Sequence, residues 1–229
     1  MSNNKTEISR VLRSKAEAKA SYDRMSRWYD VLAGSTEKKF TDIGLQKLCT
    51  QEGEIVLEIG FGTGHGVVAL AQSVGDSGKV YGMDISEGMF NIAQARARDA
   101  GLSKRVELRC GDAVNLPFAG SFFDAVFMSF TLELFDTPEI PTILRECRRV
   151  LRSGGRICVV ALSKKGKASW VMRLYEWAHR RFPKYVDCRP IFVQEALEDA
   201  AFRAFDVAQG SMWGLPVEIV VAKKTELQL

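Results

Sequence analysis

Short runs of apolar residues alternate with stretches of helical apolar spacing from residue 53 onward. The apolar runs predict five strands, at residues 55–59, 79–83, 105–110, 123–130 and 156–162. Between them the helical spacing predicts helices over 66–73, 86–100 and 138–151. Because strands and helices alternate, the pattern favours an α/β fold, a parallel sheet with helices on both faces.

The last third of the chain departs from this rhythm. A basic and aromatic insertion occupies 163–192, and a helix is predicted from 194 to 201. Two consecutive strands follow, at 202–208 and 216–223, with glycines and a proline between them. Two strands without an intervening helix form a hairpin, so at least one runs antiparallel to the others.

The polar first fifty residues also have helical spacing. We therefore expect an N-terminal helical entry or lid segment over 1–50 and a single α/β domain over 51–229, which contains the insertion.

Composition narrows the picture without pointing to a partner. The chain has 229 residues, of which 46% are hydrophobic and 26% charged, and its net charge is +4. These values are typical of a globular domain, and such a mild surplus does not indicate a nucleic-acid partner. No apolar run approaches the roughly 18–20 residues that span a bilayer. The polar start lacks the apolar core of a secretory signal, so a cytoplasmic protein is expected. Five scattered cysteines form no CxxC pair, and no metal site is expected.

A glycine-rich loop joins the first strand to the first helix: Glu58-Ile-Gly-Phe-Gly-Thr-Gly-His-Gly66. Alternate glycines let the backbone turn sharply and let a ligand lie against bare main chain. Asp84 ends the second strand, where it can accept both hydroxyls of a ribose, and Asp112 follows the third, where it can accept an adenine amino group. Each aspartate could instead cap a helix. Three acidic residues at the same edge of the sheet predict an adenine-nucleotide site.

The loop also indicates which nucleotide this is. The GxxxxGK[ST] motif of a triphosphate site is absent, and the alternate glycines differ from the GxGxxG of dinucleotide sites. A carboxylate before the loop suits a cationic ligand better than an anionic one. S-adenosylmethionine, which carries an ammonium and a sulfonium, has that character.

With these motifs, residues 20–225 resemble the class I S-adenosylmethionine-dependent methyltransferases. The most similar subgroup contains the ubiquinone and menaquinone biosynthesis C-methyltransferases, of methyltransferase type 11. Further matching motifs are Tyr81-Gly-Met-Asp-Ile-Ser86, Gly111-Asp-Ala113, Leu116-Pro-Phe118, Phe123-Asp-Ala-Val126 and Glu146-Cys-Arg-Arg-Val-Leu-Arg-Ser-Gly-Gly155. The resemblance implies a seven-stranded Rossmann-like methyltransferase fold of strand order 3-2-1-4-5-7-6 with strand 7 antiparallel, which agrees with the predicted hairpin.

The resemblance also implies a set of cofactor-binding residues for S-adenosylmethionine. The loop would line the methionine end together with Ser129, Asp84 would hold the ribose, and Asp112 would meet the adenine. An N-terminal Tyr-Asp pattern would close over the cofactor, although its two tyrosines could equally pack against the sheet. The expected set is Tyr22, Tyr29, Glu58, Gly60, Phe61, Gly62, Thr63, Gly64, Asp84, Ile85, Met89, Asp112, Ala113 and Ser129.

The segment after the fourth strand informs on the acceptor. Methyl transfer from a sulfonium mainly requires alignment and exclusion of water, so no triad is expected. Residues 129–135 lack the (Asp/Asn)-Pro-Pro-aromatic motif that amino-methylating enzymes share, which disfavours nucleic acid. They are apolar apart from Glu133, which is either an acceptor-site residue or a solvated helix cap.

The insertion carries a second set of candidates. Residues 163–190 hold eight lysines and arginines against two acidic residues, among several aromatic ones. This suits an anionic apolar substrate or peripheral contact with an anionic membrane, unless the helix merely packs on the core with a solvated basic side. His179 and Tyr185 are candidate bases, and the alternative for His179 is a surface helix position.

We therefore expect methyl transfer from S-adenosylmethionine to a small apolar or amphipathic acceptor, with a quinone precursor as the leading example. A lipid head-group N-methyltransferase and a non-catalytic S-adenosylmethionine-binding protein remain as alternatives. An arsenite methyltransferase, which would bind its metalloid through thiolates such as Cys110 and Cys188, is disfavoured because no family cysteine pattern is present. The oligomeric state is left open.

Overall fold

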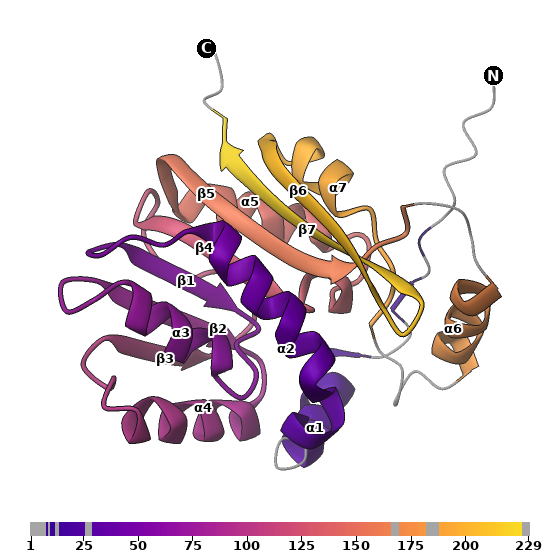
Figure 1. Ribbon diagram of the computed structural model, residues 1–229, viewed down its shortest axis with the longest axis horizontal. Helices are drawn as coiled ribbons and strands as arrows, with labels where there is room; N and C mark the ends of the chain where they lie inside the picture. Colours follow the sequence, from indigo (N-terminus) through magenta and orange to yellow (C-terminus); the bar gives the residue numbers. More distant parts are fainter. Residues whose placement is uncertain are drawn as a thin grey trace.

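The computed structural model describes residues 8, 10, 11, 14–25, 29–165, 170–181 and 188–225, with the side chains of 25 and 29–35 excepted (Figure 1). Its strands are β1 (Ile55–Ile59), β2 (Lys79–Asp84), β3 (Val106–Cys110), β4 (Phe123–Ser129), β5 (Leu151–Leu162), β6 (Phe202–Met212) and β7 (Leu215–Lys224). Its α-helices are α1 (Lys15–Met25), α2 (Tyr29–Leu48), α3 (His65–Ser73), α4 (Glu87–Asp99), α5 (Ile140–Val150), α6 (Trp170–Arg181) and α7 (Val193–Asp199). A single 3-10 turn, η1 (Leu132–Leu134), follows β4.

The strands form one sheet of order β3-β2-β1-β4-β5-β7-β6. Strands β1 to β5 pair in parallel, whereas β7 runs antiparallel to both β5 and β6. The predicted fold, including the antiparallel strand 7, is therefore confirmed. Because β1 to β4 are parallel, their carboxyl ends meet at one edge of the sheet.

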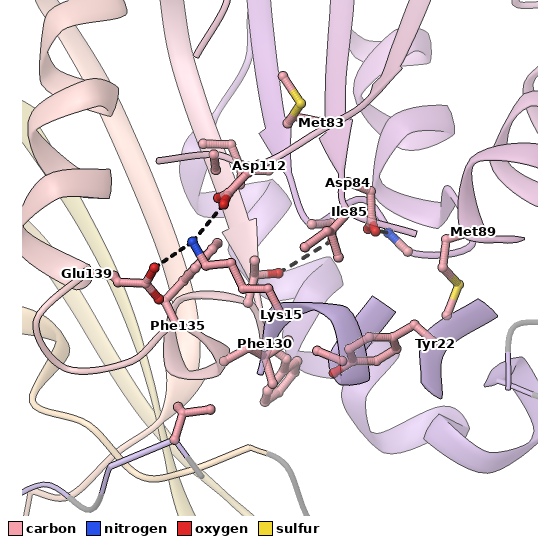
Figure 2. Close-up of a pocket in the computed structure, with 18 of the residues that line it drawn as sticks. Lys15, Tyr22, Met83, Asp84, Ile85, Met89, Asp112, Phe130, Phe135 and Glu139 are labelled. Carbon is pink, nitrogen blue, oxygen red and sulfur yellow. Dashed lines mark hydrogen bonds and ion pairs between the residues drawn. The ribbon is translucent and has the colours of Figure 1, made fainter. Parts of the chain in front are cut away.

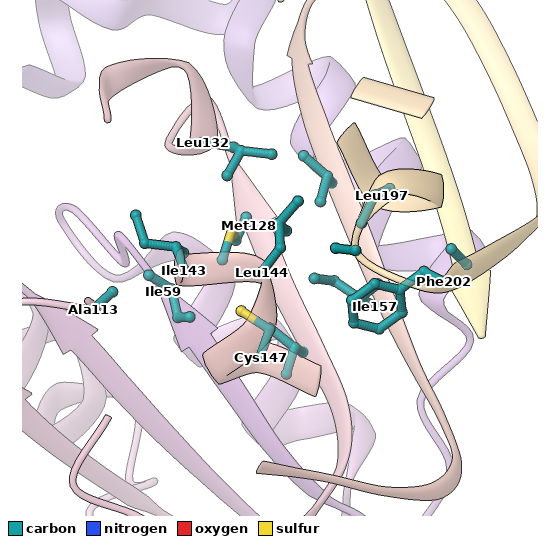
Figure 3. Packing of buried hydrophobic residues seen from close by; sticks show 14 of the residues in the cluster. Ile59, Ala113, Met128, Leu132, Ile143, Leu144, Cys147, Ile157, Leu197 and Phe202 are labelled. Carbon is teal, nitrogen blue, oxygen red and sulfur yellow. The ribbon is translucent and has the colours of Figure 1, made fainter. Parts of the chain in front are cut away.

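Helices cover both faces of this sheet, and each face has its own apolar cluster. Alternation along β1 sends Leu57 and Ile59 to one face and Val56 to the other. The Leu57 face packs against α5 and α7, where Leu144 and Leu197 are fully buried (Figure 3). The opposite face packs against α2, α3 and α4.

Three predicted boundaries differ from the structure. The helix predicted over 138–151 ends at Val150, and β5 already begins at Leu151 rather than after the two glycines. Here the sheet pairing passes from Leu151 directly to Arg156, so the residues between them form a bulge in which Gly154 has a φ of +72°. The strand predicted over 202–208 continues to Met212, because its pairing with β7 continues as far as Met212 and Leu215.

The N-terminal segment contains one helix that is integral to the sheet packing. In α2, Phe40 and Leu48 are buried against the sheet, and Gly44 allows a close approach to Val160. The preceding helix, α1, lies against α4 at the carboxyl edge of the sheet (Figure 1). None of the helices among the described residues has the length and the apolar character needed to cross a bilayer.

Candidate functional site

A pocket opens at the carboxyl edge of the sheet, between the ends of β1, β2, β3 and β4 and helix α1 (Figure 2). It is the place where open α/β sheets bind ligands. Nine of the expected cofactor-binding residues line it: Tyr22, Gly60, Gly62, Asp84, Ile85, Met89, Asp112, Ala113 and Ser129.

The glycine loop forms one wall of the pocket in a backbone conformation that requires glycine. Gly60 has a φ of +72°, and a Cβ there would lie 2.2 Å from Oγ1 of Thr131. Gly62 also has a positive φ, of +51°, but nothing lies within 4 Å of the position its Cβ would take. The loop thus leaves open space beside bare main chain on the pocket side, as a ligand requires.

Asp84 fixes this loop to the end of β2. Its Oδ2 accepts a hydrogen bond from the N–H of Gly62, and its Oδ1 accepts one from the N–H of Ser86, both at 2.9 Å. Burial raises the pKa of the Asp84 carboxyl, and these backbone donors only partly offset that rise. The carboxylate oxygens retain lone pairs that face the pocket, where they can accept ligand hydroxyls.

Asp112 forms an ion pair that the sequence motifs do not predict. Nζ of Lys15, from α1, lies 2.6 Å from Oδ2 of Asp112 and 2.5 Å from Oε1 of Glu139 (Figure 2). All three side chains are partly exposed, with 31–42% of each side chain accessible. A ligand amino group that reached Asp112 would therefore compete with Lys15.

Helix α1 is fixed over the pocket by a second contact. Oδ1 of Asp23 accepts hydrogen bonds from Oγ of Ser86 at 2.6 Å and from the N–H of Gly88 at 2.9 Å. These groups belong to the N-terminus of α4, where an acidic residue is favourable. The contact holds Tyr22 of the expected Tyr-Asp pattern at the pocket wall.

Four of the expected residues do not line the pocket. Phe61 is buried against Gly82, Thr63 accepts a hydrogen bond from Arg96 at 3.0 Å, and Gly64 is the N-cap of α3. Their positions give the loop its shape without reaching the pocket. The side chains of Tyr29 and Tyr185, which were also expected at the site, lie outside the described residues.

Glu58, the fourth, lies beneath the loop rather than beside the ligand space. It is buried, and its Oε1 lies 2.2 Å from the position of a Cβ on Gly66. Burial, followed by the nearby charge of Asp84, raises the pKa of Glu58 well above its ordinary value. Among the described residues, no group makes a hydrogen bond to its Oε2.

A second, largely apolar part of the pocket wall comes from the segment after β4. Phe130, Leu134 and Phe135 line it, and His179 of α6 reaches the same pocket. His179 is only 2% exposed, so it is not the surface position that was considered as an alternative. This placement brings one of the candidate bases to the pocket.

Glu133 proves to be neither a solvated cap nor a lining residue. Its side chain is fully buried, and its Oε1 accepts a hydrogen bond from the N–H of Leu162 at 3.2 Å. The η1 turn directs the side chain of Glu133 toward β5. The negative charges of Asp136 and Glu133 also act on the buried guanidinium of Arg189. Burial nevertheless lowers the pKa of that guanidinium.

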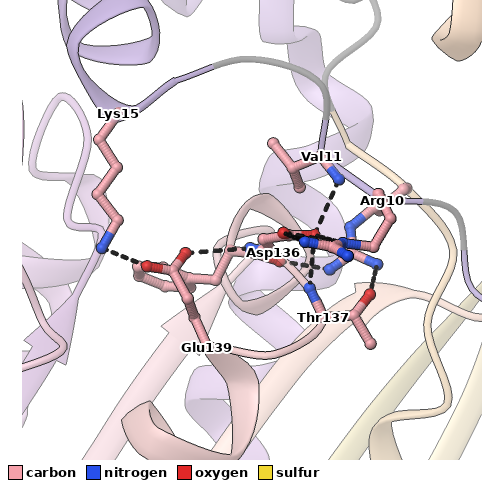
Figure 4. Close-up of polar contacts among 8 residues, drawn as sticks. Arg10, Val11, Lys15, Asp136, Thr137 and Glu139 are labelled. Atoms are coloured by element: carbon pink, nitrogen blue, oxygen red, sulfur yellow. Dashed lines mark hydrogen bonds and ion pairs between the residues drawn. The ribbon is translucent and has the colours of Figure 1, made fainter.

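Asp136 anchors the first described residues to the rim of the pocket. Nε of Arg10 lies 2.9 Å from its Oδ1, Nη2 lies 2.6 Å from its Oδ2, and the N–H of Val11 donates to it at 3.1 Å (Figure 4). The hydrogen bonds from Arg10 lower the pKa of Asp136 to about 2. The motifs gave no signal for Val11, Lys15, Asp136 or Glu139, all of which line the pocket.

The cysteines do not gather at the pocket. Cys147 and Cys158 are buried in the core, and Cys110 and Cys188 are absent from the pocket lining. Within the described part of the chain, no group of three or more histidines, cysteines and acidic residues is arranged to hold a metal.

Comparisons with known proteins agree with this geometry. A family described as "Methyltransferase domain" matches residues 56–155. The demethylmenaquinone methyltransferase of Bacillus velezensis is 34% identical over 143 residues, which cover 62% of this chain and 59% of that protein. The enzyme of the same name from Bacillus pumilus is 28% identical over 208 residues, with coverage of 80% and 86%. The chain thus spans about three-fifths of the length of the first of these relatives.

Solved structures share the fold. A SAM-dependent methyltransferase from Aquifex aeolicus has a TM-score of 0.62 and 26% identity, with 81% of this chain and 89% of that chain covered. The cyclase SpnF has a TM-score of 0.74 over 93% of this chain and 97% of its own, at 19% identity. At that identity the second likeness concerns the fold alone.

The pocket fits S-adenosylmethionine chemically. Four carboxylates, of Asp84, Asp112, Asp136 and Glu139, line it against one lysine, which suits a ligand that carries an ammonium and a sulfonium. The open space beside Gly62 gives the ligand main chain to lie against. Residues 56–155 therefore match a methyltransferase domain, and the chain is similar to demethylmenaquinone methyltransferases and to a solved SAM-dependent methyltransferase.

Proposed function

We propose that this chain transfers a methyl group from S-adenosylmethionine to a small apolar or amphipathic acceptor, with a demethylated quinone precursor as the leading candidate. The observation that carries the proposal is the pairing of two unlike walls in one pocket. The glycine loop and Asp84 form a polar wall, and Phe130, Leu134 and Phe135 form an apolar one. The names of the similar demethylmenaquinone methyltransferases support a quinone as the acceptor.

The polar wall would hold the cofactor. Asp84 would accept the ribose hydroxyls while it keeps its two backbone donors, and the main chain at Gly60 and Gly62 would lie along the methionine. Asp112 would meet the adenine amino group once that group displaces Lys15. When bound, S-adenosylmethionine supplies an electrophilic methyl group on a sulfonium.

The apolar wall would position the acceptor and exclude water. An in-line displacement depends on the alignment of the nucleophile with the methyl group, which aromatic walls such as those of Phe130 and Phe135 can impose. Because helix α1 covers the pocket through Asp23, the reacting groups would be shielded from solvent during transfer. These tasks need positioning rather than a strong catalytic group.

His179 is the candidate proton acceptor within this proposal. Methylation at the carbon of a hydroquinone releases a proton, and the imidazole of His179 lies in the wall of the same pocket. A positioned imidazole can take up a proton from a reacting group.

The test is methyl transfer from S-adenosylmethionine labelled in its methyl group to a demethylmenaquinone analogue with a short side chain. We expect a labelled quinone product. His179→Gln should lower kcat by about a hundredfold or more while the Kd for the cofactor stays unchanged. Label in a phospholipid head group instead of the quinone would identify the lipid methyltransferase. Tight cofactor binding without label in any acceptor would identify a non-catalytic binding protein.

A further inference from the structure

Helix α6 presents two faces of opposite character. Its inner face packs on the body of the protein: Met172 and His179 are buried, and the hydroxyl of Tyr175 donates to the carbonyl oxygen of Cys188 at 2.9 Å. Its outer face is largely exposed to solvent. Three large apolar side chains on it are mostly exposed, Trp170 (75%), Leu174 (54%) and Trp177 (52%).

The three exposed side chains form one stripe, because residues at i, i+4 and i+7 lie on the same side of a helix. Isolated exposed apolar residues are common, but a contiguous stripe on one helix marks an interaction surface. The stripe contributes nothing to the hydrophobic cores of the sheet. Because exposed apolar surface is unfavourable in water, this stripe favours a partner that buries it.

The charge around the stripe indicates what kind of partner this is. Arg173, Arg180 and Arg181 are exposed on the same helix. The acidic residue of the helix, Glu176, is engaged by Lys164, whose Nζ lies 3.4 Å from its Oε1. A short helix with tryptophans and leucine on one face and arginines beside them is typical of a segment that lies in the interface of an anionic bilayer.

The surroundings extend the same surface. Figure 1 shows α6 beside the tip of the β6–β7 hairpin, and a Cβ on Gly214 of that tip would lie 3.5 Å from Cγ1 of Val171. The hairpin tip carries a fourth exposed apolar side chain, Trp213, which is 64% accessible. Through His179, the inner face of the same helix lines the pocket. The apolar surface and the pocket wall are thus two sides of one helix.

We propose that the outer face of α6, formed by Trp170, Leu174, Trp177 and the flanking arginines, binds an anionic lipid surface and so places the pocket beside it. The proposal deepens the proposed function, on which it rests, because an acceptor dissolved in lipid would then reach the pocket without crossing water. The indole and leucine side chains enter the boundary between head groups and acyl chains, and the arginines pair with lipid phosphates.

The experiment measures binding of the full chain to vesicles of phosphatidylcholine with and without phosphatidylserine, in the absence of cofactor and acceptor. We expect binding to the anionic vesicles that weakens with salt, and quenching of tryptophan fluorescence by brominated acyl chains. The double variant Trp170→Ser/Trp177→Ser should bind at least tenfold more weakly. Arg173→Glu should lose about fivefold or more, since each basic residue near the surface contributes on that scale.

Matched controls lie elsewhere on the protein. Phe205 on β6 is similarly exposed (53%), so Phe205→Ser should leave vesicle binding unchanged. Arg98 on α4 has 71% of its side chain exposed, so Arg98→Glu controls for the reversal of one surface charge. Equal losses in these controls and in the α6 variants would overturn the proposal, and so would equal binding to neutral and anionic vesicles.

Self-association through the same face is the competing outcome. In this outcome, sedimentation shows a dimer that becomes monomeric in Trp170→Ser/Trp177→Ser, while the protein does not bind vesicles. This result would contradict lipid binding and identify a second copy of the chain as the partner. Failure of this inference is distinguishable from failure of the proposed function. Methyl transfer to the short-chain quinone without vesicle binding would refute only the inference, and vesicle binding without any methyl transfer would refute only the function.

Discussion

The carboxylate of Asp84 is the position where a single substitution most directly tests how this pocket holds its cofactor. Asp84→Asn keeps the size of the side chain but removes its charge. It also replaces one carboxylate oxygen by an amide NH₂ group, which can only donate hydrogen bonds. In the structure, Oδ2 accepts from Gly62 and Oδ1 accepts from Ser86, both at 2.9 Å. The asparagine can keep only one of these acceptors, so its amide must face either a backbone N–H or a ribose hydroxyl.

The expected size of the effect follows from these contacts. A hydrogen bond to a charged group contributes about 1.5–3 kcal/mol. If the substitution removes one charged acceptor from the two ribose hydroxyls, the Kd for S-adenosylmethionine should rise by roughly 10–150-fold. S-adenosylhomocysteine shares the ribose, so its Kd should rise by the same factor. The methyl group and the sulfonium do not enter this comparison.

Isothermal titration calorimetry with both ligands measures these constants, and thermal unfolding shows whether the variant remains folded. Asp76→Asn is the matched control, because Asp76 is 90% exposed and pairs with Arg105 away from the pocket lining. If the affinity for the cofactor changes less than twofold in Asp84→Asn but falls strongly in Asp112→Asn, Asp84 is not the residue that holds the ribose. This result would place the ribose on the carboxylate of β3 rather than on that of β2.

Three further substitutions probe the loop and its cover. Burial raises the pKa of Glu58 in the folded state, so the folded protein retains a proton that the unfolded chain releases. The free energy of unfolding should therefore fall as the pH rises from the ordinary pKa of a glutamate toward the raised pKa of Glu58. Glu58→Gln should flatten this decline in denaturant titrations over a pH series, and an unchanged slope would contradict the assignment. Gly64 has a φ of +85°, and Gly64→Ala places a Cβ 2.7 Å from a side chain of α4, so it should lower the free energy of unfolding by about 2 kcal/mol or more. Gly101 has a φ of +74° with nothing within 4 Å of its Cβ position, so Gly101→Ala should lower it by only about 1 kcal/mol in the same titrations. Lys15→Met frees Asp112 from an exposed ion pair and should tighten cofactor binding by up to about fivefold in calorimetry, and weaker binding would show that the ion pair supports the site instead.

The sheet could be predicted from the sequence because its central strands are buried on both faces. The run from Phe123 to Ser129 is almost continuously apolar, and short apolar runs bounded by glycines admit few other structures. The start of β5 could not be predicted in the same way. Arg152 and Ser153 are polar and exposed, and only the pairing of Leu151 with Phe123 makes them part of a bulged strand. That pairing is a tertiary contact, which local pattern does not encode.

The site divides along the same physical line. Asp84 and Asp112 could be placed in advance, since a parallel sheet brings its carboxyl ends to one edge whatever the side chains are. Lys15 could not, because its position depends on how α1 docks on α4. For Glu133, the hydrophobic pattern gave no hint that the η1 turn would bury a carboxylate against the N–H of Leu162.

The N-terminal cover is held by polar contacts, and this has a consequence for turnover. Lys15 pairs with Asp112 and Glu139, and Arg10 pairs with Asp136, in contacts that remain partly exposed (Figure 4). Solvent screens exposed ion pairs of this kind, so they are weak, and added salt weakens them further. A cover closed by apolar burial would hold the product as firmly as the substrate, whereas ion pairs can open in every cycle. Added salt should therefore lower the Kd for the cofactor in the unsubstituted protein. This salt dependence should be smaller in Lys15→Met, measured by the same calorimetric titrations.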